Sequence, residues 1–168
     1  MAKSVLVAYG SKYGATAEIA ERIGQTLREK GLQADVLSAE RVKDPGAYQA
    51  VVLGSAVYIG QWRKNAADFL KRNEAALARL PAWLFSSGPS GRGDPKELVK
   101  GWVLPADLQP VADRVRPRDV AVFHGNLNER KANLLEKWLV KNVGGEMGDF
   151  RDWQAVAAWA AGIAGALQ

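Results

Sequence analysis

Short apolar runs alternate with helical patterns of apolar and polar positions along most of this chain. The runs predict five strands, at 3–8, 34–38, 48–56, 81–87 and 119–124. Helical spacing predicts helices at 16–30, 64–79, 126–143 and 153–167. The third run is apolar at consecutive positions from Ala50 to Leu53, which is expected of a strand covered on both faces.

Strands that are separated by helices form a parallel sheet with helices on both faces, so we expect an α/β protein. Ligands of such sheets bind beyond the carboxyl ends of the strands. The loops after the first, third and fourth strands should therefore lie together. The segment 90–117 departs from the alternation: it is rich in Gly, Pro and charge, with short helices expected at 95–100 and 106–114.

The composition narrows the classes of site. With 168 residues, we expect a single domain over 1–168. The absence of cysteine excludes disulfides and thiolate chemistry, and His124 is the only histidine, so we expect no metal site. The chain starts on a strand pattern, and no apolar run approaches the roughly 20 residues that span a bilayer. We therefore expect a cytoplasmic protein.

The first loop, residues 9–16, is the most informative segment. It joins a strand to a helix through Gly, Ser and Thr, an arrangement that binds phosphate with free backbone N–H groups and hydroxyls. The motifs for nucleoside triphosphates and dinucleotides are absent from it, and acids of a phosphoacceptor site are missing from the ends of the first and third strands. No nucleophile-elbow motif occurs either. A mononucleotide phosphate remains.

The next two loops indicate what the mononucleotide carries. Small residues follow the third strand, with Tyr58 and Trp62 available to pack on a flat ring. Small residues also follow the fourth strand. A phosphate site with aromatic walls suits flavin mononucleotide (FMN). The expected cofactor contacts are Ser11, Lys12, Tyr13, Gly14, Ala15, Thr16, Ser55, Ala56, Val57, Tyr58, Ile59, Gly60, Ser87 and Gly88.

These loops resemble those of the flavodoxin family. The family's phosphate loop runs roughly [ST]-x-[ST]-G-x-T; Ser11, Gly14 and Thr16 match it, and Tyr13 replaces the middle hydroxyl residue. Its second loop often reads Gly-x-Ser-Thr-Trp, and Tyr58 stands where the aromatic residue would be. The resemblance implies a flavodoxin-like, doubly wound, five-stranded parallel sheet in the order 2-1-3-4-5. It also implies non-covalent FMN.

One branch, the menaquinone-dependent protoporphyrinogen dehydrogenases, is similar along the chain. The similar segments are 31–36, 54–60, 144–146 and 152–153, and that branch has an extra helix after the fifth strand, as expected here at 126–143. The resemblance implies a quinone partner and contact with the inner face of the membrane through this helix. The helix is less aromatic and less basic here than in the dehydrogenases. A surface helix packed on the domain is the alternative.

We therefore expect an FMN-binding redox protein, which transfers electrons or dehydrogenates a substrate, such as protoporphyrinogen, into quinone. The net charge of +5 favours acidic or anionic partners, and we expect no nucleic acid. Few acids stand in the cofactor loops, which predicts a less negative flavin potential than in acidic carriers. The alternatives are a non-redox binding module of this fold, favoured by Tyr13, and a different flavin such as a deazaflavin.

Overall fold

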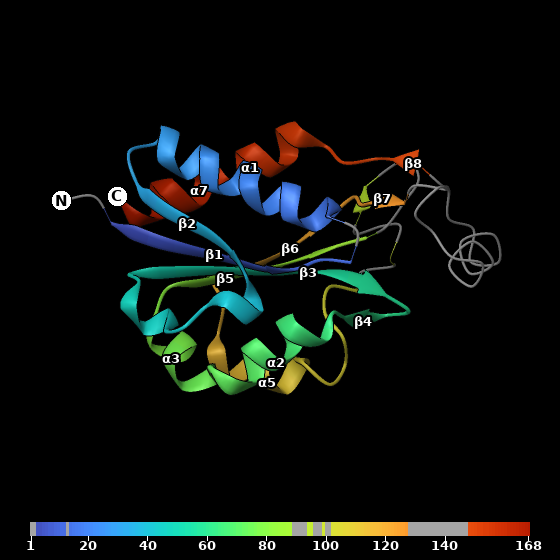
Figure 1. Ribbon diagram of the computed structural model, residues 1–168, viewed down its shortest axis with the longest axis horizontal. Coiled ribbons are helices and arrows are strands. Elements are labelled where there is room, and N and C mark those ends of the chain that lie inside the picture. Colours follow the sequence, from blue (N-terminus) through green and yellow to red (C-terminus); the bar gives the residue numbers. More distant parts are fainter. Residues whose placement is uncertain (1–2, 13, 89–93, 96–98, 100–101, 128–147) are drawn as a thin grey trace.

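The computed structural model has three layers, with helices on both faces of a central sheet (Figure 1). It describes residues 3–12, 14–88, 94–95, 99, 102–127 and 148–168. One face is covered by α1 (Ala15–Glu29) and α7 (Trp153–Leu167). The other face is covered by α2 (Lys64–Arg72), α3 (Glu74–Arg79) and α5 (Gln109–Val115), with the short 3-10 turns η1 (Ala39–Arg41) and η2 (Pro45–Ala47).

Five parallel strands form the sheet in the order β2-β1-β3-β5-β6. They are β1 (Ser4–Gly10), β2 (Gln33–Ser38), β3 (Ala50–Tyr58), β5 (Ala82–Ser87) and β6 (Asp119–Phe123). Since β5 and β6 are the fourth and fifth predicted strands, the predicted order 2-1-3-4-5 is confirmed. Two short additions are β4 (Gln61–Trp62), antiparallel to β3, and the pair β7 (Asn126–Leu127) and β8 (Gly148–Asp149).

The sheet separates two apolar cores. Along β1, Val5 and Val7 pack toward α1 and α7, whereas Leu6 and Ala8 pack toward α2 and α5. The run 50–53 in β3 is fully buried, as its uninterrupted apolar sequence predicts. The sheet is therefore packed on both faces, and the loops at its carboxyl edge extend from buried strands.

Two predicted helices differ from the structure. The helix expected over 64–79 breaks at Asn73, whose side-chain amide donates to the carbonyl oxygen of Phe69 at 2.9 Å. The same carbonyl also accepts the Asn73 backbone N–H at 3.0 Å, and Asn73 itself has the non-helical ψ of 19°, so α3 starts as a separate helix one residue later. The helix expected over 126–143 does not start at 126, because 126–127 pair with β8. Residues 128–143 lie outside the described part of the chain.

Candidate functional site

The loops that follow β1, β3, β5 and β6 meet at one edge of the sheet (Figure 1). The strand register aligns Gly10 with Ser55, and Ser55 with Ser86. It also aligns Ser87 with Phe123. The chain leaves β1 toward α1 on one face and leaves β3 toward α2 on the other. This divergence is where α/β sheets bind ligands.

The first loop enters α1 through a left-handed turn. Gly14 has φ +90°, and its backbone N–H donates to the Ser11 hydroxyl at 3.0 Å. Helical residues begin at Ala15, so the next backbone N–H groups have no acceptor within the helix. The helix start therefore offers hydrogen-bond donors and the positive end of the helix dipole to an anion. Tyr13 lies outside the described residues.

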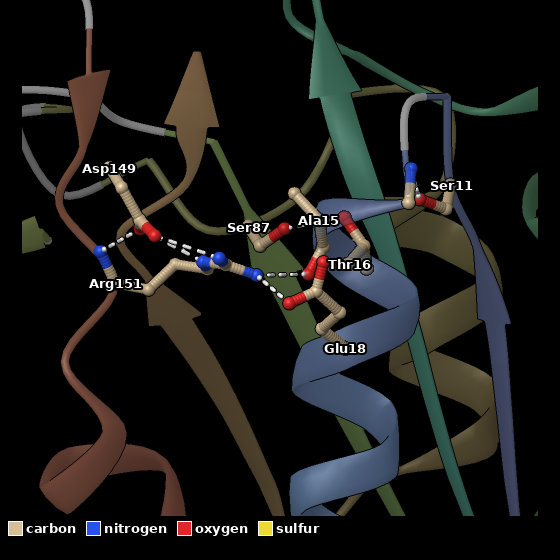
Figure 2. Close-up of polar contacts among 8 residues, drawn as sticks. Ser11, Ala15, Thr16, Glu18, Ser87, Asp149 and Arg151 are labelled. Atoms are coloured by element: carbon tan, nitrogen blue, oxygen red, sulfur yellow. Dashed lines mark hydrogen bonds and ion pairs between the residues drawn. The ribbon is translucent and has the colours of Figure 1, made fainter. Parts of the chain in front are cut away.

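A buried hydrogen bond connects the first loop to the end of β5. The hydroxyls of Thr16 and Ser87 lie 2.8 Å apart, and the two residues are only 1% and 2% exposed. Both were expected to contact the cofactor, and Figure 2 shows them facing each other between α1 and the sheet. They bring the first and third predicted loops into direct contact.

The first loop also contacts the second. The Lys12 ammonium lies 4.1 Å from the centroid of the Tyr58 ring, a distance at which a cation is attracted to an aromatic face. Tyr58 is the last residue of β3, and Val57 and Ala56 precede it in the strand. A positive charge is thus held against the aromatic side chain expected to pack on the flavin.

The β3–β4 hairpin turns through two residues with positive φ. Ile59 has φ 51° and Gly60 has φ 70°. Positive φ is easy for glycine but unfavourable for a β-branched residue, at a cost of about 1–3 kcal/mol. The Ile59 side chain is 60% exposed, so an apolar group stands at the tip of this turn.

Ser55 and Trp62 also lie inside the protein. The Ser55 hydroxyl donates to the Ala56 carbonyl and accepts from the Arg63 N–H, and Ser55 is fully buried. Trp62 is 6% exposed, and its indole N–H donates to the Ser86 hydroxyl at 2.8 Å. Trp62 is therefore part of the core and not an exposed aromatic side chain beside the loops, because its indole N–H bonds to a buried hydroxyl.

Glycines allow the third loop and the loop after β6 to approach closely. The N–H of Gly88 donates to the Phe123 carbonyl at 3.2 Å. A Cβ on Gly88 would lie 3.3 Å from the Val57 Cβ, and one on Gly125 would lie 2.9 Å from the Gly88 Cα. The sequence analysis assigned no role to Gly125; its small size is needed here because two backbones touch.

His124 ends the fifth predicted strand, and in the structure it directly follows β6 at this edge. Its ring centroid lies 6.5 Å from that of Phe150. The Nε2 atom is buried and has no hydrogen-bond partner within the part of the chain that the structure describes. Its ring is thus packed against the segment that leads to α7.

Arg151 is a residue that sequence reasoning missed. Its side chain is 6% exposed and forms an ion pair with Asp149 at 2.8 Å and another with Glu18 at 3.1 Å. The guanidinium also donates to the Ala15 carbonyl at 3.3 Å and lies over the Trp153 ring at 4.7 Å. Hydrogen bonding from Arg151 lowers the pKa of Asp149, and the same bond raises the pKa of Arg151. No sequence signal links it to α1, which lies far away along the chain.

The described ranges contain neither a metal-binding cluster nor a membrane-spanning helix. Within residues 3–12, 14–88, 94–95, 99, 102–127 and 148–168, no three His, Asp or Glu side chains gather closely enough to hold a metal ion. Of the helices in those ranges, none combines the length and apolarity needed to cross a bilayer.

Comparison with known proteins identifies relatives of the whole chain. A family model described as "Flavodoxin domain" matches residues 6–153. The protoporphyrinogen IX dehydrogenase [quinone] of Escherichia coli strain K12 is 26% identical over 170 residues, which covers 95% of this chain and 93% of that protein. The family match supports a flavin cofactor.

Solved flavodoxin structures share the fold at low sequence identity. A flavodoxin from the domain Archaea is 17% identical, with a TM-score of 0.62 and 98% of each chain covered. The flavodoxin of Streptococcus pneumoniae TIGR4 is also 17% identical, with a TM-score of 0.61 and coverage of 97% of this chain and 99% of the other. The flavodoxin-like arrangement predicted from the sequence is thereby confirmed.

Proposed function

This chain belongs to the flavodoxin domain family, and from that premise we propose that it is a single domain over 1–168 that binds FMN and transfers electrons. The observation that carries the proposal is the contact among the three predicted loops at the start of α1. Thr16 bonds to Ser87, and Lys12 lies against Tyr58. These contacts join a candidate phosphate site to a candidate ring site.

The residues present fit the two parts of FMN. The first N–H groups of α1, with Ser11 and Thr16, suit the phosphate because they supply hydrogen-bond donors at a helix start. Tyr58 suits the isoalloxazine ring by stacking. Gly88 has no side chain, so the backbone of the third loop could approach the isoalloxazine ring closely. The bound flavin would supply the redox chemistry, and the protein would position it and set its potential.

We propose further that a quinone accepts the electrons. The support is the E. coli relative, which aligns with nearly the whole of this chain and bears "[quinone]" in its name. Protoporphyrinogen is the corresponding substrate proposal. Peripheral contact with the inner face of the membrane through 126–143, including Trp138 and Leu139, is a further proposal, and residues 128–143 of that segment lie outside the described ranges.

An absorbance spectrum after reconstitution tests the proposed function. The purified protein is incubated with FMN and desalted, and a retained oxidised-flavin band is expected. Chemical reduction should bleach this band. If the protein passes electrons to a quinone, a menaquinone analogue should restore it by reoxidising the flavin. Reoxidation by protein carriers only would favour an electron carrier. No retained band would favour a non-redox module. Retention of a deazaflavin in place of FMN would identify the deazaflavin as the cofactor.

The Lys12 side chain is expected to raise the potential of the bound flavin. Its ammonium sits against Tyr58, so it would favour the anionic reduced form. Lys12→Glu should lower the two-electron midpoint potential by roughly 20–40 mV, since reversing one partly buried charge changes its interaction with the flavin by about 1–2 kcal/mol. Potentiometric titration of the reconstituted protein measures this.

Lys30→Glu is the matched control for this prediction. Lys30 is exposed at the C-cap of α1, at the far end of a 15-residue helix that is about 22 Å long. Salt screens charges over about 10 Å, so the potential should stay close to that of the parent. Equal shifts in both variants would mean that Lys12 acts only through net charge.

A further inference from the structure

The Arg151 guanidinium is fixed beside the first turn of α1 (Figure 2). Its Nε and one terminal nitrogen bond both oxygens of Asp149, at 2.9 and 2.8 Å. The other terminal nitrogen contacts Glu18 and the Ala15 carbonyl. Paired fork-like bonds of this kind hold a guanidinium in one orientation. Arg151 therefore cannot turn toward solvent without breaking contacts with two segments.

Two carboxylates share this single cation. Glu18 projects from the first turn of α1 and its side chain is 64% exposed, whereas Asp149 belongs to β8. With Arg151 in place, the three side chains carry one net negative charge. Without it they would carry two. Thr16, a proposed phosphate contact, lies between Ala15 and Glu18 in the first turn of α1, and Arg151 contacts both of these residues. The charge of the cluster therefore acts on an anion bound at the helix start.

We propose that Arg151 sets the preference of this site for a phosphate-bearing flavin, because it offsets one of the two negative charges of Glu18 and Asp149 beside the phosphate loop. The proposal rests on the proposed FMN site. It makes Arg151 a positioning residue: it touches the protein's carboxylates and the Ala15 carbonyl, and acts on the ligand through them. The expected ligand class is a flavin mononucleotide, with riboflavin, its analogue without phosphate, as the probe for the difference.

Arg151→Met tests the proposal with both flavins. Methionine keeps an apolar stem near Trp153 and removes the charge. The dissociation constant for FMN should rise roughly 10–50-fold, and that for riboflavin should change less than about twofold, because only the phosphate meets the uncompensated carboxylates. The FMN defect should shrink at high salt, which screens the repulsion. Adding Glu18→Gln and Asp149→Asn to Arg151→Met should restore most of the FMN affinity.

Glu18→Gln alone changes FMN affinity in the direction opposite to Arg151→Met, and it leaves the buried arginine in place. If Arg151 serves to offset negative charge, the variant should bind FMN about two- to fivefold more tightly. If the Arg151–Glu18 pair serves only to hold the fold, the variant should bind no better and melt earlier. Glu21→Gln, on the same helix and exposed, is the matched control and should leave FMN affinity unchanged.

The outcomes separate this proposal from the proposed function. Wild-type protein that binds neither flavin would overturn the FMN site itself. Wild-type protein that binds FMN, together with Arg151→Met that loses FMN and riboflavin equally, would overturn the role of Arg151 in selectivity. Unfolding of Arg151→Met leaves the Glu18→Gln result to decide: tighter FMN binding supports the proposal, and unchanged or weaker binding contradicts it.

Discussion

Replacing Thr16 with valine is expected to weaken FMN binding by roughly 10–100-fold, while riboflavin binding stays within about threefold of the parent. Valine has nearly the shape of threonine, so the change removes a hydroxyl and little else. A hydrogen bond to a charged group contributes about 1.5–3 kcal/mol, and the Thr16 hydroxyl is a proposed donor to the phosphate. Titration calorimetry with both flavins measures the two affinities.

Thr26→Val is the matched control for Thr16→Val. Thr26 lies on the same helix, is also buried, and donates its hydroxyl hydrogen to the Arg22 carbonyl at 3.0 Å. It should lose about 1 kcal/mol of stability and no FMN affinity. Thr16→Val also leaves the Ser87 hydroxyl without its partner, so both variants are compared by thermal melting. Equal FMN binding by all three proteins would contradict a phosphate role for Thr16.

Gly54→Val is expected to lower the unfolding free energy by about 3 kcal/mol and the melting temperature by roughly 6–12 °C. Gly54 lies in the central strand β3, and a Cβ there would come within 2.1 Å of the Phe85 ring. Phe85 cannot move away easily, because it is fully buried and packs against Phe123 and Trp159. Thermal melting followed by circular dichroism measures the loss.

Gly162→Ala is a glycine replacement that is expected to raise the unfolding free energy, in contrast to Gly54→Val. Gly162 is exposed within α7, and a Cβ there would meet no atom within 4 Å. Alanine should stabilise the helix by about 0.5–1 kcal/mol, because glycine is a poor helix former. If Gly54→Val melts at the parent temperature, the claim that Phe85 leaves no room for a side chain at Gly54 is contradicted.

Local signals accounted for most of the sheet and for the ends of α1. The apolar run at 50–53 identified a strand covered on both faces, since a half-exposed strand would alternate. Gly31 directly follows the predicted helix over 16–30. It has φ +92°, and the N–H of Leu32 bonds back to the Leu27 carbonyl, which closes that helix end. These features depend on neighbouring residues and can be predicted from them.

The features that the sequence analysis missed depend on contacts between distant segments. From the sequence, Trp62 could pack on a flavin ring or against the protein; its N–H bonds to Ser86 on β5 and its ring is buried, which decides for the protein. Arg151 pairs with Glu18 across most of the chain. Asn73 could equally continue a helix or interrupt it. None of these outcomes follows from periodicity, because each is decided by a partner that periodicity does not identify.

The most direct test of the central claim is an amide NMR titration of the isotope-labelled protein with FMN. If FMN binds at the start of α1, the largest chemical-shift changes should fall on 11–16, 55–60 and 86–88, and riboflavin should cause smaller changes at 11–16. Changes concentrated in the hollow between α5 and the start of β6, lined by Val103, Ala112 and Val120, would contradict it. So would a spectrum that FMN leaves unchanged.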